Sequence, residues 1–125
     1  MTQGKKVLLV GLEPTLVDYA KLPMKLDEPT LRRGLETDLG KLRDLGYAAE
    51  WVLVDRGETA EAVVAAKLRS EPFDCVLIGA GIRTIPPLFS LFEKLVNAVH
   101  EHAPRAKICF NTQPDDTAES VQRWI

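Results

Sequence analysis

Apolar residues are distributed along this chain in two alternating patterns. In the first pattern they form short, largely apolar runs of about four to eight residues bounded by turn residues, which is typical of strands; residues 75–78 are apolar throughout, as in a strand covered on both faces of a sheet. These runs occupy residues 6–12, 47–54, 75–78 and 106–111. In the second pattern apolar residues recur at spacings of three and four, which predicts amphipathic helices. The helices predicted between and after the runs span residues 27–46, 59–70, 86–102 and 117–124.

The first predicted helix carries start and stop residues as well as an apolar stripe. Asp27 is a capping acid, and Pro29 stands in the first turn, where proline is tolerated. Gly46 follows the last leucine of the stripe and is a common helix-ending residue. Gly34 and Gly40 lie inside the helix and cost about 1 kcal/mol each relative to alanine, so packing of the stripe must outweigh them. The stripe consists of Leu31, Leu35, Leu39, Leu42 and Leu45.

The order of the predicted elements, strand then helix four times over, specifies the fold class. Such alternation produces parallel strands joined by right-handed crossovers, with helices on both faces of the sheet. Glu50 stands in the middle of the second run, and its carboxylate would be costly to bury in a central strand, which favours an edge position. We therefore expect one domain over residues 1–125, a three-layer, doubly wound, flavodoxin-like α/β fold with four main strands in the order 2-1-3-4.

The connection after the first strand, residues 13–26, is longer than the roughly two to six residues usual between a strand and a helix. It contains Tyr19 and two prolines, Pro14 and Pro23. Two interpretations are open: the segment forms a partial lid over a functional site, or it holds a short extra turn. Loops at this edge of a sheet often carry function.

Charge and composition exclude several classes of function. The 16 basic residues are balanced by 18 acidic ones, so we expect no nucleic-acid binding of the kind that relies on a general basic field. No apolar run approaches the roughly 20 residues of a membrane span, and we expect no membrane partner. The apolar stretch after Lys6 ends at Glu13, too soon for the core of a signal peptide. Cys75 and Cys109 fall in predicted strands as small buried residues, which indicates a cytoplasmic protein.

The third predicted strand breaks at Gly79 into a glycine-bearing turn, which is the candidate functional site. In a 2-1-3-4 sheet the helices after strands one and three lie on opposite faces, so a crevice opens at the carboxyl ends of these strands. Backbone amides from Gly79 to Gly81, the start of the next helix and the Arg83 guanidinium suit a small anionic ligand such as a carboxylate or phosphate. The candidate ligand-binding residues are Gly11, Glu13, Gly79, Gly81, Arg83, Thr84, Asn111 and Thr112.

A structural interpretation of the same residues is also open. Glycines at positions 79 and 81 permit a tight turn. Arg83 could pair only with Glu13, and Thr84 could be a helix cap. In the functional interpretation Arg83 binds the anion through its planar pair of donors, and Glu13 orients that guanidinium across the crevice.

No complete catalytic, cofactor or metal motif accompanies the glycine-bearing turn. The turn lacks the third glycine of a dinucleotide fingerprint, and no Gly-Lys-Ser or Gly-Lys-Thr follows it. His100 and His102 are two positions apart on a helix and do not share a face, so we expect no metal site. Ser90 and Ser120 have no histidine partner in a suitable position. The sequence therefore leaves both catalysis and any cofactor undetermined.

One part of the chain resembles a receiver domain of response regulators. The resemblance rests on the Phe73–Ile78 segment, the Pro86-Pro87 pair and the apolar helix that follows. Gly79 stands where receivers carry the phospho-accepting aspartate, Glu13 alone remains of their acidic pair, and no fifth strand supplies their lysine. The resemblance therefore implies a related fold without phosphotransfer, which is the basis for an alternative function as a non-catalytic interaction module.

Two further segments, residues 78–87 and 111–119, resemble a family of small, uncharacterised bacterial proteins with a flavodoxin-like fold. That resemblance implies a bacterial protein and no particular activity. The apolar face of the 86–102 helix is wide, with Phe89 beside its main stripe, and the fourth strand is a free edge of the kind that proteins usually cover. We therefore expect a homodimer that buries part of this side.

Overall fold

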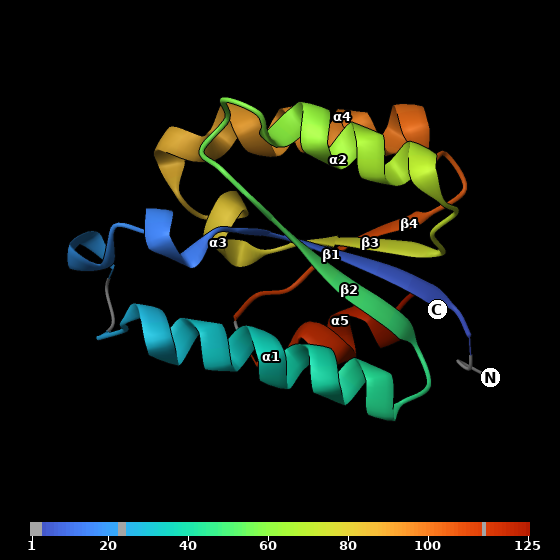
Figure 1. Ribbon diagram of the computed structural model, residues 1–125, viewed down its shortest axis with the longest axis horizontal. Helices are drawn as coiled ribbons and strands as arrows, with labels where there is room; N and C mark the ends of the chain where they lie inside the picture. The colour runs from blue at the N-terminus through green and yellow to red at the C-terminus, as the bar shows by residue number, and fades with distance from the viewer. Residues whose placement is uncertain (1–3, 23–24, 114) are drawn as a thin grey trace.

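The computed structural model describes residues 4–22, 25–113 and 115–125, and within them four strands form one sheet (Figure 1). All neighbouring strands are parallel, and their order is β2-β1-β3-β4. The predicted flavodoxin-like α/β fold with strand order 2-1-3-4 is therefore confirmed. The strands are β1 (Lys6–Leu12), β2 (Ala48–Val54), β3 (Cys75–Ile78) and β4 (Lys107–Phe110).

Helices cover both faces of the sheet and produce the three layers visible in Figure 1. Helices α2 and α4 lie on one face, and α1 and α5 lie on the other. The crossover from β1 to β2 runs in one direction along the sheet, and those from β2 to β3 and from β3 to β4 run in the other. Right-handed connections therefore place α1 on one face and α2 and α4 on the opposite face. The helices are α1 (Glu28–Asp44), α2 (Ala60–Ser70), α3 (Ala80–Arg83), α4 (Phe89–His102) and α5 (Thr117–Gln122), with 3₁₀ turns η1 (Pro14–Leu16), η2 (Tyr19–Lys21) and η3 (Pro86–Leu88).

Each face of the sheet has its own apolar core, because side chains alternate between faces along a strand. Leu8 and Val10 of β1 pack with α2 and α4, whereas Val7 and Leu9 pack with α1 and α5. All four side chains are fully buried. Burying one such side chain stabilises a fold by roughly 1.5–3 kcal/mol, so the central strand contributes to both cores at once.

The ends of α1 have the capping chemistry that the sequence predicts. The Asp27 carboxylate accepts a hydrogen bond of 2.9 Å from the Thr30 amide, which is one of the unpaired donors of the first turn. At the other end Gly46 has a φ of +97°, in the left-handed region that favours glycine. The boundaries of α1 are therefore determined by local residues.

The segment after β3 differs from the glycine-bearing turn predicted there. Residues Ala80–Arg83 form the short helix α3, and Gly79 has a φ of −72°. Among the described glycines only Gly4, Gly46 and Gly57 have positive φ, so neither Gly79 nor Gly81 has the left-handed backbone that only glycine adopts readily. The long helix also begins later than Pro86, because η3 precedes α4.

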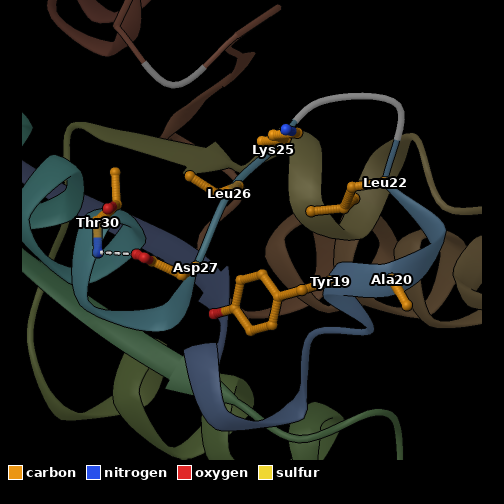
Figure 2. A pocket seen from close by; sticks show the side chains of 7 residues that line it. All are labelled: Tyr19, Ala20, Leu22, Lys25, Leu26, Asp27 and Thr30. Carbon is orange, nitrogen blue, oxygen red and sulfur yellow. Dashed lines mark hydrogen bonds between the residues drawn. The ribbon is translucent and has the colours of Figure 1, made fainter.

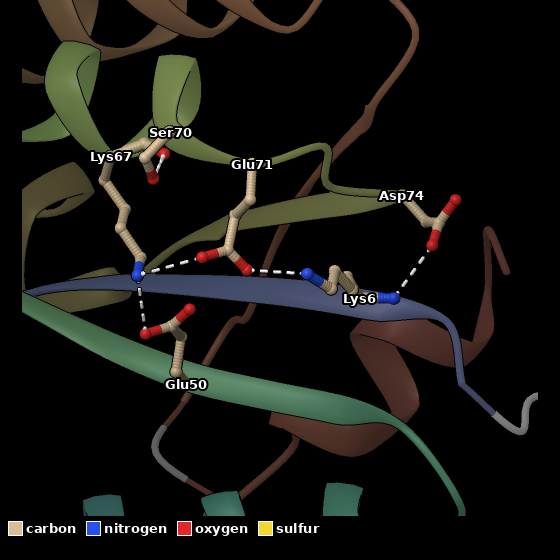
Figure 3. Close-up of polar contacts among 6 residues, drawn as sticks. All are labelled: Lys6, Glu50, Lys67, Ser70, Glu71 and Asp74. Carbon is tan, nitrogen blue, oxygen red and sulfur yellow. Dashed lines mark hydrogen bonds and ion pairs between the residues drawn. The ribbon is translucent and has the colours of Figure 1, made fainter.

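Glu50 is accommodated on the edge strand β2 by a surface ion network (Figure 3). Its carboxylate lies 3.0 Å from Lys67 Nζ of α2, and Glu71 lies 3.4 Å from the same ammonium and 2.8 Å from Lys6 Nζ. The hydrogen bond to Glu50 raises the pKa of Lys67, and the hydrogen bond from Lys6 lowers the pKa of Glu71. These partly exposed pairs keep the Glu50 charge out of the core, as an edge strand permits.

Candidate ligand site at the crest of the sheet

A small cleft of about 80 Å³ opens at the carboxyl ends of β1 and β3, under the first half of α1. This is the point in the sheet where the chain direction switches, and folds of this class bind ligands there. The walls of the cleft are largely apolar and include the Trp51 side chain of β2. The other apolar side chains that line it are Leu12, Val17, Leu31 and Leu35.

Glycines at the ends of β1 and β3 allow close approaches around the cleft. A Cβ atom on Gly11 would lie 2.9 Å from the Trp51 ring, so the ring packs directly against the glycine backbone. The Gly79 amide donates a hydrogen bond of 2.9 Å to the Val10 carbonyl, and a Cβ atom on Gly79 would lie 3.4 Å from that oxygen. Gly81 also lines the cleft, and a Cβ atom there would meet nothing within 4 Å. Glycine is therefore required at position 11 because the Trp51 ring packs against it. A left-handed backbone is not the reason for glycine at position 11 or at position 79.

A chain of hydrogen bonds runs past the cleft through buried side chains. Asn111 Oδ1 accepts from the Ala80 amide at 2.8 Å, and Asn111 Nδ2 donates to Thr117 Oγ1 at 3.2 Å. The Thr117 hydroxyl in turn donates to Asp38 Oδ2 at 2.8 Å. Asn111 and Asp38 both line the cleft, so this chain presents two polar groups in an otherwise apolar space. It also joins α3, the end of β4, α5 and α1.

Asp38 is a site residue that the sequence analysis missed. Its side chain is only 3% exposed, and burial raises its pKa, against the Thr117 hydrogen bond and the Lys41 charge, which lower it. A detectable signal did exist in the sequence. Asp38 stands three residues after Leu35 and four before Leu42, which places an acidic residue within the apolar stripe of the helix.

Arg83, the cation expected at the site, does not line the cleft. Its Nη2 donates to the Asn111 carbonyl at 2.8 Å, and its buried Nε has no partner among the described residues. Glu13 forms its ion pair with Arg32, at the start of α1. The predicted pairing of Arg83 with Glu13 is therefore wrong, because α1 brings a competing guanidinium to the carboxylate.

The two threonines among the candidates have local structural partners. The Thr84 hydroxyl donates to the Ala80 carbonyl at 2.6 Å, so Thr84 caps the end of α3 and not the start of the long helix. The Thr112 hydroxyl donates to Asp116 just before α5. Of the predicted residues the cleft brings together Gly11, Gly79, Gly81 and Asn111, whereas Glu13, Arg83, Thr84 and Thr112 do not line it.

A second hollow, of about 540 Å³, lies beside the start of α1 (Figure 2). Two of its polar groups already serve the fold: the Tyr19 hydroxyl donates to the Pro14 carbonyl at 2.7 Å, and Asp27 caps Thr30. The 13–26 connection next to it contains 3₁₀ turns, in agreement with the expected extra turn, while residues 23 and 24 lie outside the described part. We therefore regard the crest cleft as the better candidate.

Histidines and cysteines occupy separate places in the fold. In the described ranges no three His, Cys, Asp or Glu side chains are grouped to hold a metal ion. His102 lies 3.6 Å from Glu101 at the end of α4. Cys75 and Cys109 are free and buried, with their Sγ atoms 3.4 Å apart between β3 and β4.

In comparisons with known proteins, no family model and no curated protein matches this chain. No helix among the described residues has both the length and the apolarity needed to cross a bilayer. The geometry of the cleft is therefore the basis on which a function can be proposed.

Proposed function

We propose that this protein binds a small molecule in the crest cleft at the carboxyl ends of β1 and β3. The observation that carries the proposal is the meeting of apolar walls with two buried polar side chains, Asp38 and Asn111, at the switch point of the sheet. Ligand sites in proteins commonly combine a largely apolar lining with a few placed polar groups. The cleft is smaller than the roughly 300–1,000 Å³ of a site that encloses a whole ligand, so it receives one end of its ligand.

The residues that line the cleft do not favour the anionic ligand expected from the sequence. Neither lysine nor arginine is among the cleft residues, and the Arg83 guanidinium is engaged by the Asn111 carbonyl. An anion at the cleft would instead face the Asp38 side chain. The proposal is therefore of small-molecule binding in general, and catalysis is not part of it, because Asp38 is the only titratable group among the residues that line the cleft.

A fragment screen by NMR tests this function directly. On titration of the ¹⁵N-labelled protein with a library of small fragments, we expect hits whose shifts cluster on the amides of Gly79, Gly81 and Asn111. Leu35→Gln should weaken those hits about fivefold, because it removes an apolar contact of about 1 kcal/mol from the wall. Leu39→Gln is the matched control, since Leu39 is also half-buried on α1 but does not line the cleft.

The screen contradicts the proposal if no fragment shifts the cleft amides, or if all hits lie at the hollow beside Tyr19. Equal weakening by Leu35→Gln and Leu39→Gln would also contradict it. A thermal-shift screen against metabolites complements the titration, because a ligand at 100 times its Kd stabilises a protein by about 2.7 kcal/mol.

The alternative function, a non-catalytic interaction or dimerisation module, draws on a different part of the surface. Phe89 at the start of α4 is 61% exposed, and Val63 on the adjacent helix α2 is 43% exposed. Exposed apolar side chains on two neighbouring helices are a feature of association surfaces. The test of this alternative is the state of assembly in solution.

A further inference from the structure

Asp38 gives the crest cleft an acidic side chain that forms no ion pair within the described part of the chain. Among the described residues, the only side chain that hydrogen-bonds to its carboxyl group is Thr117. A carboxylate has about four acceptor positions, so a single donor leaves most of its capacity unused. A buried carboxylate in this situation is stabilised by any donor or cation that reaches it.

The basic side chains near the cleft are committed elsewhere or remain in solvent. Arg32 is paired with Glu13 and Glu28, and Arg83, which does not line the cleft, donates to the Asn111 carbonyl. Lys41, one turn along α1, is exposed, and within the described part of the chain it forms no ion pair with Asp38.

Two further carboxylates, on the segment before α5, also act on Asp38. Asp115 and Asp116, just before α5, add to the field at Asp38. Asp38 itself is the one charged side chain among the described residues that line the cleft, and a carboxylate there attracts a cation.

The remaining walls suit the apolar stem of such a cation. The Trp51 ring is fixed by a hydrogen bond of 2.9 Å from its Nε1 to the Leu35 carbonyl, and it rests on Gly11. Cations are favoured near the face of an indole ring, and the apolar wall accepts a short hydrocarbon chain. A cleft of about 80 Å³ has room for a head group of only a few heavy atoms.

We infer that the crest cleft is a site for the ammonium end of a small organic amine, with Asp38 as its counter-ion and Trp51 and Leu35 as the walls around its stem. This inference rests on the proposed function and adds the charge of the ligand to it. It reverses the sign expected from Arg83. The competing explanation is that Asp38 serves only to join α1 to α5 through Thr117.

Three compounds with the same four-carbon skeleton distinguish the charges: n-butylammonium, 1-butanol and butyrate. In ¹⁵N titrations we expect n-butylammonium to shift the amides of Gly79, Ala80 and Asn111 saturably. Butyrate should bind there at least about tenfold more weakly, because it places a carboxylate beside Asp38. Asp38→Asn retains an acceptor for the Thr117 hydroxyl but removes the charge, and it should abolish the preference for the ammonium. Thr117→Val retains the charge, and it should preserve that preference.

A measurement on the unaltered protein covers the case in which Asp38→Asn does not fold. The affinity for n-butylammonium should rise with pH as Asp38 ionises, with Lys41, Asp115 and Asp116 as the neighbouring charges, whereas the affinity for 1-butanol should not change.

Butyrate binding as tightly as n-butylammonium would overturn the inference, but it would not contradict the proposal that the cleft binds a small molecule. The same holds if Asp38→Asn binds the ammonium as well as the natural chain does, or if the cleft takes only neutral fragments. If none of the three compounds and no library fragment shifts the cleft amides, the inference and the proposed function both fail.

Discussion

Asp38 contributes to stability with a sign opposite to that of most carboxylates in folded proteins. Burial raises its pKa above the ordinary value of 3.8, so the native state holds this proton more tightly than the unfolded chain does. By linkage, the contribution of Asp38 to stability is greatest at low pH. It is lost as the pH rises from the ordinary value through the raised native one.

We therefore expect Asp38→Asn to become more favourable relative to the natural chain as the pH rises from about 4 to about 7. The amide keeps an acceptor for Thr117 and carries no charge to desolvate. Urea unfolding of both proteins across this range measures the difference in free energy of unfolding. A difference that stays constant, or that moves in favour of aspartate, would contradict the assignment.

The glycines of α1 allow a test of helix propensity. Cβ atoms on Gly34 and Gly40 would meet nothing within 4 Å, so Gly34→Ala and Gly40→Ala should each stabilise the protein by about 0.5–1 kcal/mol. Gly11→Ala should instead destabilise it, because its Cβ atom would meet the Trp51 ring. Chemical denaturation of the three variants checks both signs. Stabilisation by Gly11→Ala would show that the ring is free to move.

For individual residues, the sequence predicts those contacts that form between near neighbours along the chain. Asp27 and Gly46 were assigned correctly because a cap acts within its own turn. Arg83 was assigned incorrectly because its acceptor, the carbonyl of Asn111, lies 28 residues away, and because Arg32 occupies Glu13. No local pattern reports either contact.

The elements themselves show how turn residues determine where a helix begins. Helix α2 was expected to start near Thr59, and it starts at Ala60. Its free amides are covered by Asp55 of the preceding turn, which accepts from the amides of Gly57, Thr59 and Ala60 and from the Thr59 hydroxyl. Asp55 therefore caps this helix, whereas the Thr59 side chain at the N-cap position makes no capping hydrogen bond.

Removing this cap should lower stability in a pH-dependent way. The Thr59 hydrogen bonds lower the pKa of Asp55, so its contribution is present above the ordinary value of 3.8 and lost as the pH falls through the native value. Asp55→Ala should lower the melting temperature at neutral pH, and the loss should shrink in acid. Glu58→Ala in the same turn is the control and should change little, because Glu58 is exposed.

Element order was predictable and α3 was not. Strand and helix periodicities were strong enough to establish the alternation, and Glu50 indicated which strand lies at the edge. By contrast Gly79 and Gly81 resemble a turn in sequence. In the structure the Ala80 amide is satisfied by the Asn111 side chain, which stabilises a helical turn there. That partner comes from the far end of β4.

For the molecule as a whole, the α4 and β4 side is the surface on which we expect a second copy to bind. Phe89 is largely exposed, and Phe92 and Phe110 form a half-buried ring pair at the β4 edge with centroids 5.5 Å apart. Arg123 donates to the Phe110 carbonyl at 3.0 Å and covers part of that edge. The side chains of α4 are therefore the better-exposed part of this surface.

We expect a homodimer in light scattering at micromolar concentration, and Phe89→Ser should shift it to the monomer, because an interface loses most from an exposed aromatic anchor. Leu45→Ser at the C-cap of α1, in the opposite layer, is the control for a general loss of surface apolarity, since Leu45 is 41% exposed. A monomeric mass for the natural chain, or equal effects of the two substitutions, would count against this surface.

The contact between Trp51 and Gly11 has a spectroscopic consequence. The chain has two tryptophans, and Trp124 is 53% exposed, whereas the Trp51 ring lies half-buried in the wall of the cleft. Indole emission shifts to shorter wavelength as water leaves its surroundings. In a Trp124→Phe protein the remaining indole emission, excited selectively over that of the two tyrosines, comes from Trp51, so its wavelength and quenching by iodide report on occupancy. The molecule thus carries its own optical probe at the place where a ligand would bind.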